Sequence, residues 1–350
     1  MVHAVTLRDF RSYAALELGL SEGVVLLHGP NGAGKTNLLE ALHVGTQGFS
    51  PRTRRDAQMI RFGSDAARIG LEGALGQGRF ETDVVLAVRD TRRVTLNGER
   101  LSSADRLRHE LTTLVFTPDR LAVVKGAPAT RRAYLDRALG RLFPARASLG
   151  AEYAGAVGQR NAGLRRVRAG RSTREALAPW SDRVAALGSE LVRARAEAAE
   201  LLAEPFGRVA DELGLAEAML EYEGDPPTLA DLDARLESDL ERGLTGVGPH
   251  LDDLRIEASG RDLRAFGSQG EQRVAVLALV LAEAERMRER AGMSPLVLLD
   301  DVLSELDGSR REALAGMIAR GDQTVVTATA AAALPGEAAQ VLAVSHGKVS

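Results

Sequence analysis

The chain has 350 residues, of which 45% are hydrophobic and 27% charged, and its formal net charge is −3. These proportions are typical of a soluble globular protein of about two domains. The longest strictly apolar run, Val274 to Ala282, has nine residues, whereas a membrane-spanning helix needs about 20. The absence of cysteine excludes disulfides, thiolate zinc sites and thiol catalysis. Charged residues near the N-terminus argue against a secretion signal, so we expect a cytoplasmic protein with no membrane partner.

The N-terminal part is expected to combine antiparallel strands with one early helix. Apolar residues alternate over positions 2–20, and the solid run Val24–Leu27 predicts a strand buried on both faces. A glycine-rich loop and an amphipathic helix follow. Residues 68–101 alternate again, and Asn97-Gly98 within them predicts a two-residue hairpin.

The glycine-rich loop has the composition of a phosphate-binding loop. The pattern G-x-x-x-x-G-K-[ST] is matched without a gap by Gly29, Pro30, Asn31, Gly32, Ala33, Gly34, Lys35 and Thr36. The glycines allow backbone N–H groups to face phosphate oxygens, and the following helix adds its positive end. We expect Lys35 to bind the β- and γ-phosphates of a nucleotide as a catalytic residue, and Thr36 to bind Mg²⁺. The alternative is a simple glycine turn that happens to carry Lys-Thr.

The middle of the chain, residues 129–244, is predicted to be helical, because β-branched residues are few while Ala, Leu, Arg and Glu are many. Pro179 and Pro205 are expected to bound one long helix. The segment Asp225-Pro226-Pro227 predicts a break.

Charge is distributed unevenly over this middle part. Residues 120–195 carry 16 basic and 5 acidic side chains, a net charge of +11, whereas residues 197–241 carry 2 basic and 14 acidic ones, a net charge of −12. A basic lobe is one signature of nucleic-acid binding, but two solvated helical faces of opposite sign explain the pattern equally well. Because aromatic residues make up only 4%, duplex contacts through phosphates are favoured over base stacking. The candidate phosphate contacts are Arg131, Arg132, Arg160, Arg165 and Arg166.

The C-terminal part returns to alternating strands and helices. Strands are predicted at 296–299, 324–327 and 341–345, with a helix at 309–319 between the first two. The first of these strands ends in Asp300 and Asp301, and the carboxyl ends of such strands face the ligand. We expect Asp300 to bind Mg²⁺ and Asp301 to act as the catalytic general base. Two solvated acids at a strand end are the alternative.

The segment Ser268-Gln269-Gly270-Glu271-Gln272 is predicted to open a helix that runs to about residue 290. Ser268 and Glu271 have the spacing of a capping box. A serine hydroxyl beside free N–H groups at a helix start can also detect a γ-phosphate. Both interpretations stay open at this point.

The loop, the serine segment and the acidic strand end, in this order, resemble the ATP-binding-cassette (ABC) ATPases. In that superfamily the Ser-x-Gly segment of one subunit closes over ATP held by the phosphate loop of another. The resemblance implies an ATP-dependent homodimer in which Ser268, Gly270, Glu271 and Gln272 contribute to cofactor binding. Residues 304–307 would be the D-loop. The implied fold is α/β, an ABC-type P-loop ATPase head with an inserted helical lobe, divided into residues 1–125, 126–245 and 246–350.

Further segments resemble the RecF family, bacterial recombination and repair proteins related to SMC-type heads. The matching segments are Leu7–Arg11, Phe116–Asp119, Arg131–Asp136, Gly248–His250, Asp252–Leu254 and Gly347–Val349. The resemblance implies a weak DNA-dependent ATPase of recombinational repair, replication restart and the SOS response to DNA damage. It also implies duplex or gapped DNA as ligand and a RecR-type mediator as partner.

Three departures from general ABC ATPases accompany this resemblance. The glutamine expected near Thr117 is not evident, and Ala328-Thr329 stands where a histidine is expected. The acid after the metal ligand is Asp301 rather than glutamate, so we expect slow hydrolysis. The rival hypothesis is the ATPase subunit of a membrane ABC transporter, against which the missing glutamine and histidine argue.

Overall fold

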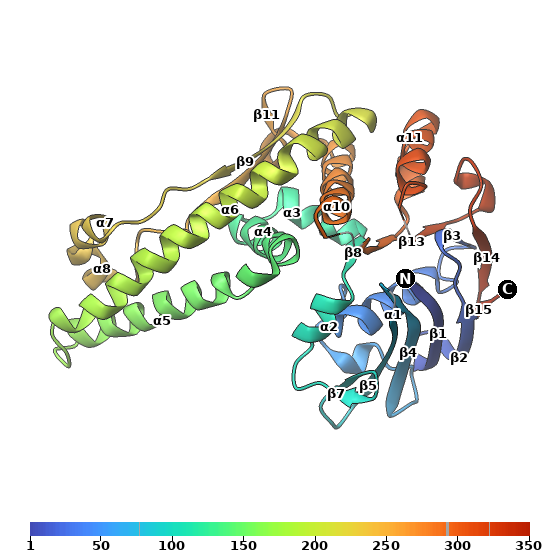
Figure 1. Ribbon diagram of the computed structural model, residues 1–350, viewed down its shortest axis with the longest axis horizontal. Helices are drawn as coiled ribbons and strands as arrows, with labels where there is room; N and C mark the ends of the chain where they lie inside the picture. Colours follow the sequence, from blue (N-terminus) through green and yellow to red (C-terminus); the bar gives the residue numbers. More distant parts are fainter. Residues whose placement is uncertain (77, 292–293, 322) are drawn as a thin grey trace. The chain divides into compact units, whose positions relative to one another are not determined.

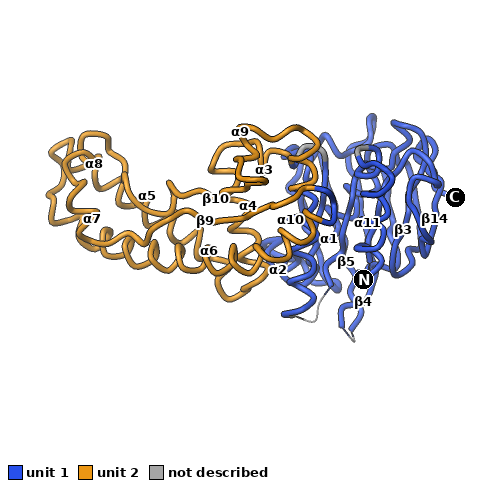
Figure 2. The backbone as a smooth tube through the Cα atoms, turned by 90° about the horizontal axis from the view of Figure 1, so that it is seen from above, with its two compact units in different colours: residues 1–120, 212–214, 276–350 blue, residues 121–211, 215–275 orange. Residues whose placement is uncertain are grey.

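The computed structural model describes residues 1–76, 78–291, 294–321 and 323–350 (Figure 1). The chain divides into two compact units (Figure 2). Unit 1 comprises residues 1–120, 212–214 and 276–350, and unit 2 comprises residues 121–211 and 215–275. Across the described ranges, no helix has both the length and the apolar character needed to cross a membrane.

The first sheet of unit 1 is antiparallel and has the strand order β2-β1-β4-β5-β6-β7. Its strands are β1 (Val2–Phe10), β2 (Tyr13–Gly19), β4 (Ala66–Leu75), β5 (Gly78–Ala87), β6 (Arg93–Leu96) and β7 (Glu99–Arg100). Asn97 and Gly98, both with positive φ, form the turn between β6 and β7. The predicted hairpin is therefore confirmed.

The second sheet of unit 1 has the order β15-β14-β3-β13-β12-β8, and every pair except β14–β15 is parallel. Its strands are β3 (Gly23–His28), β8 (Thr113–Phe116), β12 (Leu296–Leu299), β13 (Gln323–Ala328), β14 (Gln340–Ser345) and β15 (Lys348–Val349). These bounds confirm the strands predicted at 24–27, 296–299, 324–327 and 341–345. Since β3 lies between β13 and β14, the two ends of the chain build one sheet.

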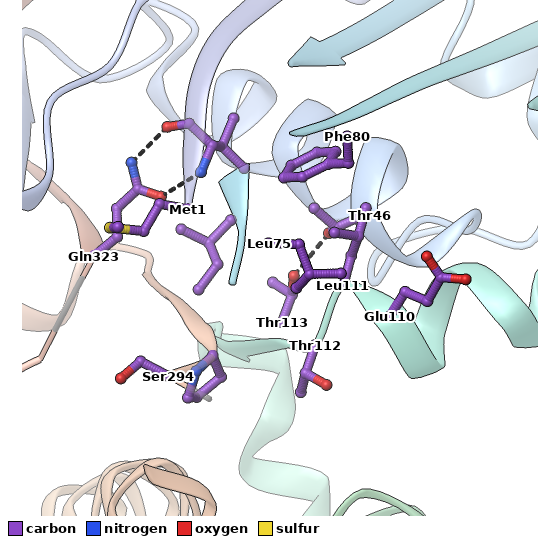
Figure 3. Close-up of a pocket in the computed structure, with 13 residues that line it drawn as sticks. Met1, Thr46, Leu75, Phe80, Glu110, Leu111, Thr112, Thr113, Ser294 and Gln323 are labelled. Carbon is purple, nitrogen blue, oxygen red and sulfur yellow. Dashed lines mark hydrogen bonds between the residues drawn. The ribbon is translucent and has the colours of Figure 1, made fainter. Parts of the chain in front are cut away.

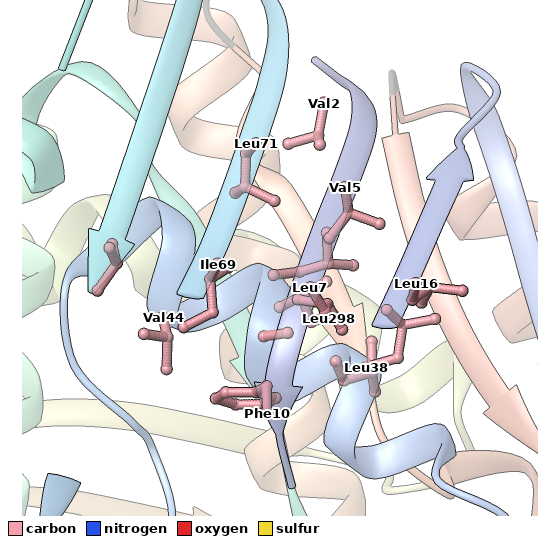
Figure 4. Close-up of a cluster of buried hydrophobic side chains, with 14 of the residues drawn as sticks. Val2, Val5, Leu7, Phe10, Leu16, Leu38, Val44, Ile69, Leu71 and Leu298 are labelled. Atoms are coloured by element: carbon pink, nitrogen blue, oxygen red, sulfur yellow. The ribbon is translucent and has the colours of Figure 1, made fainter. Parts of the chain in front are cut away.

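Helix α1 (Lys35–Gln47) packs against strands of both sheets. Eleven of its 13 residues are buried, as expected for a helix covered on all sides. One hydrophobic cluster joins Leu7 of β1, Leu38 of α1 and Leu298 of β12 (Figure 4). Burying each such side chain contributes about 1.5–3 kcal/mol. The start of α1, which carries Lys35 and Thr36, is therefore anchored in the core.

Unit 1 also contains residues 276–291, the greater part of helix α10 (Gln269–Ala291). Its remaining helices are short. They are α2 (Asp105–Glu110), α11 (Gly308–Ile318) and the 3₁₀ segments Asp56–Gln58, Val302–Glu305 and Ala331–Ala333, with a further one, Pro118–Leu121, at the border with unit 2. Helix α11 confirms the helix predicted at 309–319.

The buried amide of Gln323 joins the two sheets of unit 1. Its Oε1 accepts the Val2 N–H at 2.8 Å, and its Nε2 donates to the Val2 carbonyl at 2.7 Å (Figure 3). The same Nε2 also donates to the Ser21 carbonyl at 3.0 Å. A hollow of about 50 Å³ lies beside it, at the N-terminal ends of β8, β12 and β13. Because ligands of parallel sheets bind at the carboxyl ends of strands, this hollow is not the nucleotide site.

Unit 2 is mainly helical. Its helices are α3 (Ala122–Lys125), α4 (Pro128–Leu142), α5 (Leu149–Arg168), α6 (Ala178–Glu212), α7 (Leu229–Ala234), α8 (Leu236–Arg242), α9 (Leu263–Phe266) and the start of α10 (Gln269–Ala291), with 3₁₀ segments Pro144–Arg146 and Glu175–Leu177. The prediction that Pro205 ends the long helix is wrong, because α6 continues through it to Glu212. The buried residues Phe206 and Val209 extend the apolar face beyond the proline, so tertiary packing offsets its missing N–H.

A three-stranded antiparallel sheet, ordered β11-β10-β9, completes unit 2. Its strands are β9 (Ala218–Glu223), β10 (Asp253–Ala258) and β11 (Arg261–Asp262). Strand β9 lies in the segment predicted to be helical, so the prediction is wrong there. Its partner β10 is distant in sequence, and pairing with that strand decides the conformation of this short segment.

Candidate nucleotide-binding site

The phosphate loop connects β3 to α1 and is held by the backbone at both ends. The Gly29 N–H donates to the Ala328 carbonyl of β13 at 3.2 Å, and the Ala33 carbonyl accepts the Gly347 N–H at 3.1 Å. A Cβ on Gly29, whose φ is +153°, would lie 2.2 Å from the Val344 oxygen. Only glycine fits at this position.

Lys35 spans the loop from the first turn of α1. Its Nζ donates to the Gly29 carbonyl at 2.6 Å and to the Pro30 carbonyl at 3.0 Å, and the side chain is buried. Burial lowers the pKa of Lys35, while the charges of Asp301 and Asp300 oppose that effect. The ammonium group is thus held where it faces both the loop and the acidic strand end.

Asp300, directly after β12, connects the acidic strand end to the phosphate loop. Its Oδ1 accepts the Thr36 hydroxyl and the Thr327 hydroxyl, each at 2.9 Å. Asp300 is 5% exposed. Burial raises its pKa, and the hydrogen bonds from Thr327 and Thr36 act in the opposite direction. Two hard oxygen donors, the Thr36 hydroxyl and the Asp300 carboxylate, therefore lie side by side.

Asp301 has a left-handed backbone with φ +51°, a conformation that aspartate adopts more readily than most residues. Its N–H donates to the Thr327 hydroxyl at 2.8 Å. The Thr327 hydroxyl therefore contacts both acidic residues: it accepts the N–H of Asp301 and donates to the carboxylate of Asp300. Thr327 was not among the predicted site residues, and its place at the end of the strand beside β12 is the only sequence signal that could have indicated it.

A buried carboxylate on α1, Glu40, fixes the segments beside the loop. It accepts the Nε and Nη2 of Arg11 at 2.8 and 2.7 Å and the Nη1 of Arg52 at 3.1 Å. The positive charge of Arg52 partly opposes the effect of burial, which raises the pKa of Asp300. Neither Glu40 nor Arg52 was predicted, since a charged residue inside a helix gives no sign of its partners.

The serine segment belongs to unit 2, whereas the loop and both acids belong to unit 1. Ser268 Oγ accepts the Glu271 N–H at 3.2 Å, and the Glu271 carboxylate accepts the Ser268 N–H at 2.7 Å. This is a capping box, as one interpretation predicted, and these hydrogen bonds lower the pKa of Glu271. Gln272 is buried and donates to the Leu263 carbonyl at 2.8 Å, while Ser268 and Gly270 are exposed.

Two of the arginines predicted to contact DNA are internal, and for these the prediction is wrong. Arg131 is 3% exposed and pairs with Asp253 through two hydrogen bonds, at 2.7 and 2.6 Å. Arg160 is 1% exposed and donates to Asp239 at 2.7 Å. A guanidinium group consumed by a buried ion pair cannot reach a DNA phosphate.

The other candidate arginines differ in accessibility. Arg132 is partly buried and donates to the Asp252 carbonyl at 2.6 Å. Arg165 and Arg166 are exposed near the end of α5. From residue 153 to residue 174 the chain has six arginines and no acid. Arg165 and Arg166 therefore carry exposed positive charge, whereas Arg174 in the segment after α5 pairs with Glu237 and Arg168 donates to the Glu241 carbonyl.

Comparisons with known proteins extend over nearly the whole chain. The RecF/RecN/SMC N-terminal domain model matches residues 1–349. A DNA replication and repair protein RecF from Heliobacterium modesticaldum is 34% identical over 342 residues, covering 94% of this chain and 92% of the relative. The RecF of Anaeromyxobacter dehalogenans strain 2CP-C is 40% identical over 333 residues, covering 89% and 87%.

Solved structures agree with this match. A recombination mediator protein RecF in complex with ATP has a TM-score of 0.86 at 25% identity, covering all of this chain and 96% of the other. The Smc head domain of Pyrococcus furiosus has a TM-score of 0.62 at 16% identity, covering 100% and 95%. The second likeness concerns the fold alone.

The fold and the site define an ABC-type P-loop ATPase head of the SMC-like kind. Identity with curated relatives over about nine-tenths of the chain is more specific than the fold. The chain belongs to the RecF family, whose curated members are described as DNA replication and repair proteins. The fold class and the RecF resemblance inferred from the sequence are thereby confirmed.

Proposed function

We propose that this chain is an ATP-dependent DNA-binding protein of recombinational repair and replication restart. The observation that carries the nucleotide-binding part of the proposal is the 2.9 Å approach of the Thr36 hydroxyl, at the end of the phosphate loop, to Asp300. A hydroxyl and a carboxylate suit Mg²⁺, which prefers oxygen ligands. When bound, Mg²⁺ neutralises charge on the phosphates. A RecF of solved structure is described with ATP, which supports ATP as the nucleotide.

Each predicted site residue in unit 1 then has a role in ATP hydrolysis. Backbone N–H groups of the loop, among them those of Gly32, Gly34 and Lys35, surround the phosphates, and the Lys35 side chain binds the β- and γ-phosphates. Thr36 and Asp300 hold the metal ion. Asp301 accepts a proton from the attacking water as general base. Its side chain is one methylene shorter than glutamate, which supports slow turnover.

ATP is proposed to join two copies of the chain. Ser268 and the Gly270 N–H of one copy would contact the γ-phosphate held by the loop of the other, within the cofactor-binding segment that also contains Glu271 and Gln272. The exposure of Ser268 and Gly270 at the start of the 23-residue helix α10 supports this role. Because ATP contacts both copies and ADP lacks the γ-phosphate, dimerisation follows the state of the nucleotide.

DNA binding is proposed to use the exposed arginines near the end of α5, among them Arg165 and Arg166. Their guanidinium groups bind backbone phosphates irrespective of sequence, on duplex DNA, gapped DNA or single-strand/duplex junctions. DNA is expected to stimulate the weak ATPase, and hydrolysis ends the dimer and releases the DNA. Family resemblance supports a RecR-type mediator as partner in loading recombinase. The cytoplasm is the proposed location.

The test compares the mass of the protein by sedimentation with ATP, with a non-hydrolysable analogue and with ADP. A dimer with the first two and a monomer with ADP is expected, and equal dimerisation in all three would overturn the proposal. K35M should lose nucleotide-dependent DNA retention. K125M, which changes an exposed lysine of α3, is the matched control and should keep nucleotide binding.

The transporter hypothesis is not favoured, because the family match is to RecF, RecN and SMC proteins over residues 1–349. Stimulation of ATP turnover by duplex DNA in detergent-free protein would separate the two hypotheses. If the chain acts as a RecF-like protein, duplex DNA should increase the rate of ATP hydrolysis. If it is a transporter subunit, DNA should leave that rate unchanged.

A further inference from the structure

A buried tyrosine outside the phosphate motif contacts the loop directly. Tyr13, the first residue of β2, is 0% exposed, and its hydroxyl donates to the Gly34 carbonyl at 3.0 Å. The same carbonyl accepts the Leu38 N–H within the first turn of α1 at 3.1 Å. The Gly34 oxygen therefore accepts two hydrogen bonds, one from Leu38 of α1 and one from Tyr13 of β2. Strand β2 belongs to the antiparallel sheet, whereas β3, which leads into the loop, belongs to the mainly parallel one.

The geometry of the peptide bond connects this contact to phosphate binding. A trans peptide is planar, so the carbonyl of one residue and the N–H of the next point in opposite directions. The Gly34 carbonyl is directed along α1 toward Leu38. The Lys35 N–H is therefore directed out of the N-terminal end of α1, where free N–H groups bind phosphate. Whatever fixes the Gly34 carbonyl also fixes the direction of this N–H.

Tyr13 is itself held firmly. The turn before it is anchored by the Arg11 N–H, which donates to the Met59 carbonyl at 2.8 Å. Ser12 Oγ accepts the Asn37 Nδ2 of α1 at 3.0 Å. Burial raises the pKa of Tyr13 to about 12, so the hydroxyl stays protonated in mildly alkaline solution as well as at neutral pH. A Cβ built on Gly34 would lie 3.1 Å from this hydroxyl and 2.9 Å from Ser12 Oγ, so the Gly34 backbone lies close against these two side chains.

We propose that Tyr13 is a positioning residue, which holds the Gly34–Lys35 peptide in the orientation that a bound phosphate requires. The inference rests on the proposed binding of nucleotide by the loop. A donor at the start of α1 serves phosphates common to ATP and ADP. Loss of the Tyr13 hydroxyl should therefore weaken the binding of ATP and of ADP to the same extent, whereas a change in the Ser268 segment should weaken the binding of ATP alone.

Y13F removes the hydroxyl and keeps the ring. One hydrogen bond corresponds to about 3- to 10-fold in affinity, so the Kd of Mg-ATP and of Mg-ADP should each rise by that factor. In turnover, KM should rise while kcat stays unchanged. Y153F is the matched control, because Tyr153 is a buried tyrosine of unit 2 whose hydroxyl lies 2.8 Å from His250 Nδ1. It should alter the melting temperature without altering either Kd.

Amide hydrogen exchange gives a readout of the first turn of α1 itself, separate from nucleotide affinity. At a temperature where both variants are folded by circular dichroism, the first turn of α1 should exchange faster in Y13F than in Y153F. The role of Tyr13 would be overturned if both Kd values were unchanged in Y13F, or if only the Kd of Mg-ATP rose. If the unsubstituted protein binds neither nucleotide, the proposed function itself fails, and the two failures are thereby distinguished.

Discussion

Replacing Arg160 and Arg166 one at a time by methionine should separate two uses of arginine on α5. Arg160 is 1% exposed and donates to Asp239 at 2.7 Å, to Thr245 Oγ1 at 2.9 Å and to Ser181 Oγ at 3.2 Å. Arg166 lies six residues further along and is exposed. The same chemical change is therefore made once inside unit 2 and once on its surface.

The expected magnitudes differ widely. Methionine keeps most of the aliphatic volume of arginine, so R160M mainly removes the charge and the donors. The carboxylate of Asp239, 1% exposed, is then left without its cation, and such a loss costs about 3–5 kcal/mol of unfolding free energy. R166M removes a solvated charge, for which a change within about 0.5 kcal/mol is expected.

Urea unfolding and duplex DNA binding across a salt series measure the two roles. The slope of log K against log salt is negative, and R166M should reduce its magnitude by about one, because one phosphate contact is lost. R160M should leave that slope unchanged under conditions where it is folded. In R160M/D239L an apolar pair replaces the ion pair, and part of the lost stability should return. The reasoning is refuted if R160M costs less than about 1 kcal/mol, or if R160M reduces the magnitude of the salt slope and R166M does not.

Three further predictions concern unit 1. Burial raises the pKa of Asp300, so its ionised form destabilises the fold at neutral pH. D300N should therefore unfold at a higher urea concentration than the unsubstituted protein at pH 7, and this difference should disappear toward about pH 4. D300N should also show no Mg²⁺-dependent ATP hydrolysis. Q323L removes three hydrogen bonds and should lose about 2–4 kcal/mol in urea unfolding. D301N places asparagine, which also tolerates positive φ, at this position, so the fold should be kept. Sedimentation should show that D301N still dimerises with ATP, and an ATPase assay should detect no hydrolysis.

Much of unit 1 could be predicted from the sequence because its signals are local. The strand before Gly29, the glycine spacing and the helix after it lie within 25 residues of chain. The Asn97-Gly98 hairpin and the strand before Asp300 are equally local. Each depends on the conformational freedom of glycine or on the burial of a short apolar run, and both can be recognised without knowing any tertiary contact.

The predictions that failed depend on contacts between distant residues. Arg131 and Arg160 are arginines in a basic segment, and nothing near them in sequence shows that Asp253 and Asp239 will neutralise them. Pro205 ends a helix by local rules, yet α6 buries an apolar face on both sides of it. In each case the energy of tertiary packing or ion pairing exceeds the local preference.

The strand order explains why Thr327 is central to the site although no motif contains it. Strand β13 lies between β3, which leads into the phosphate loop, and β12, which ends at Asp300. A side chain at the carboxyl end of β13 is thus placed between the loop and the acids. The Thr327 hydroxyl accepts from Asp301 and donates to Asp300, and Asp300 accepts from Thr36. Two strands far apart in sequence therefore act as one site through the hydroxyl of the strand between them.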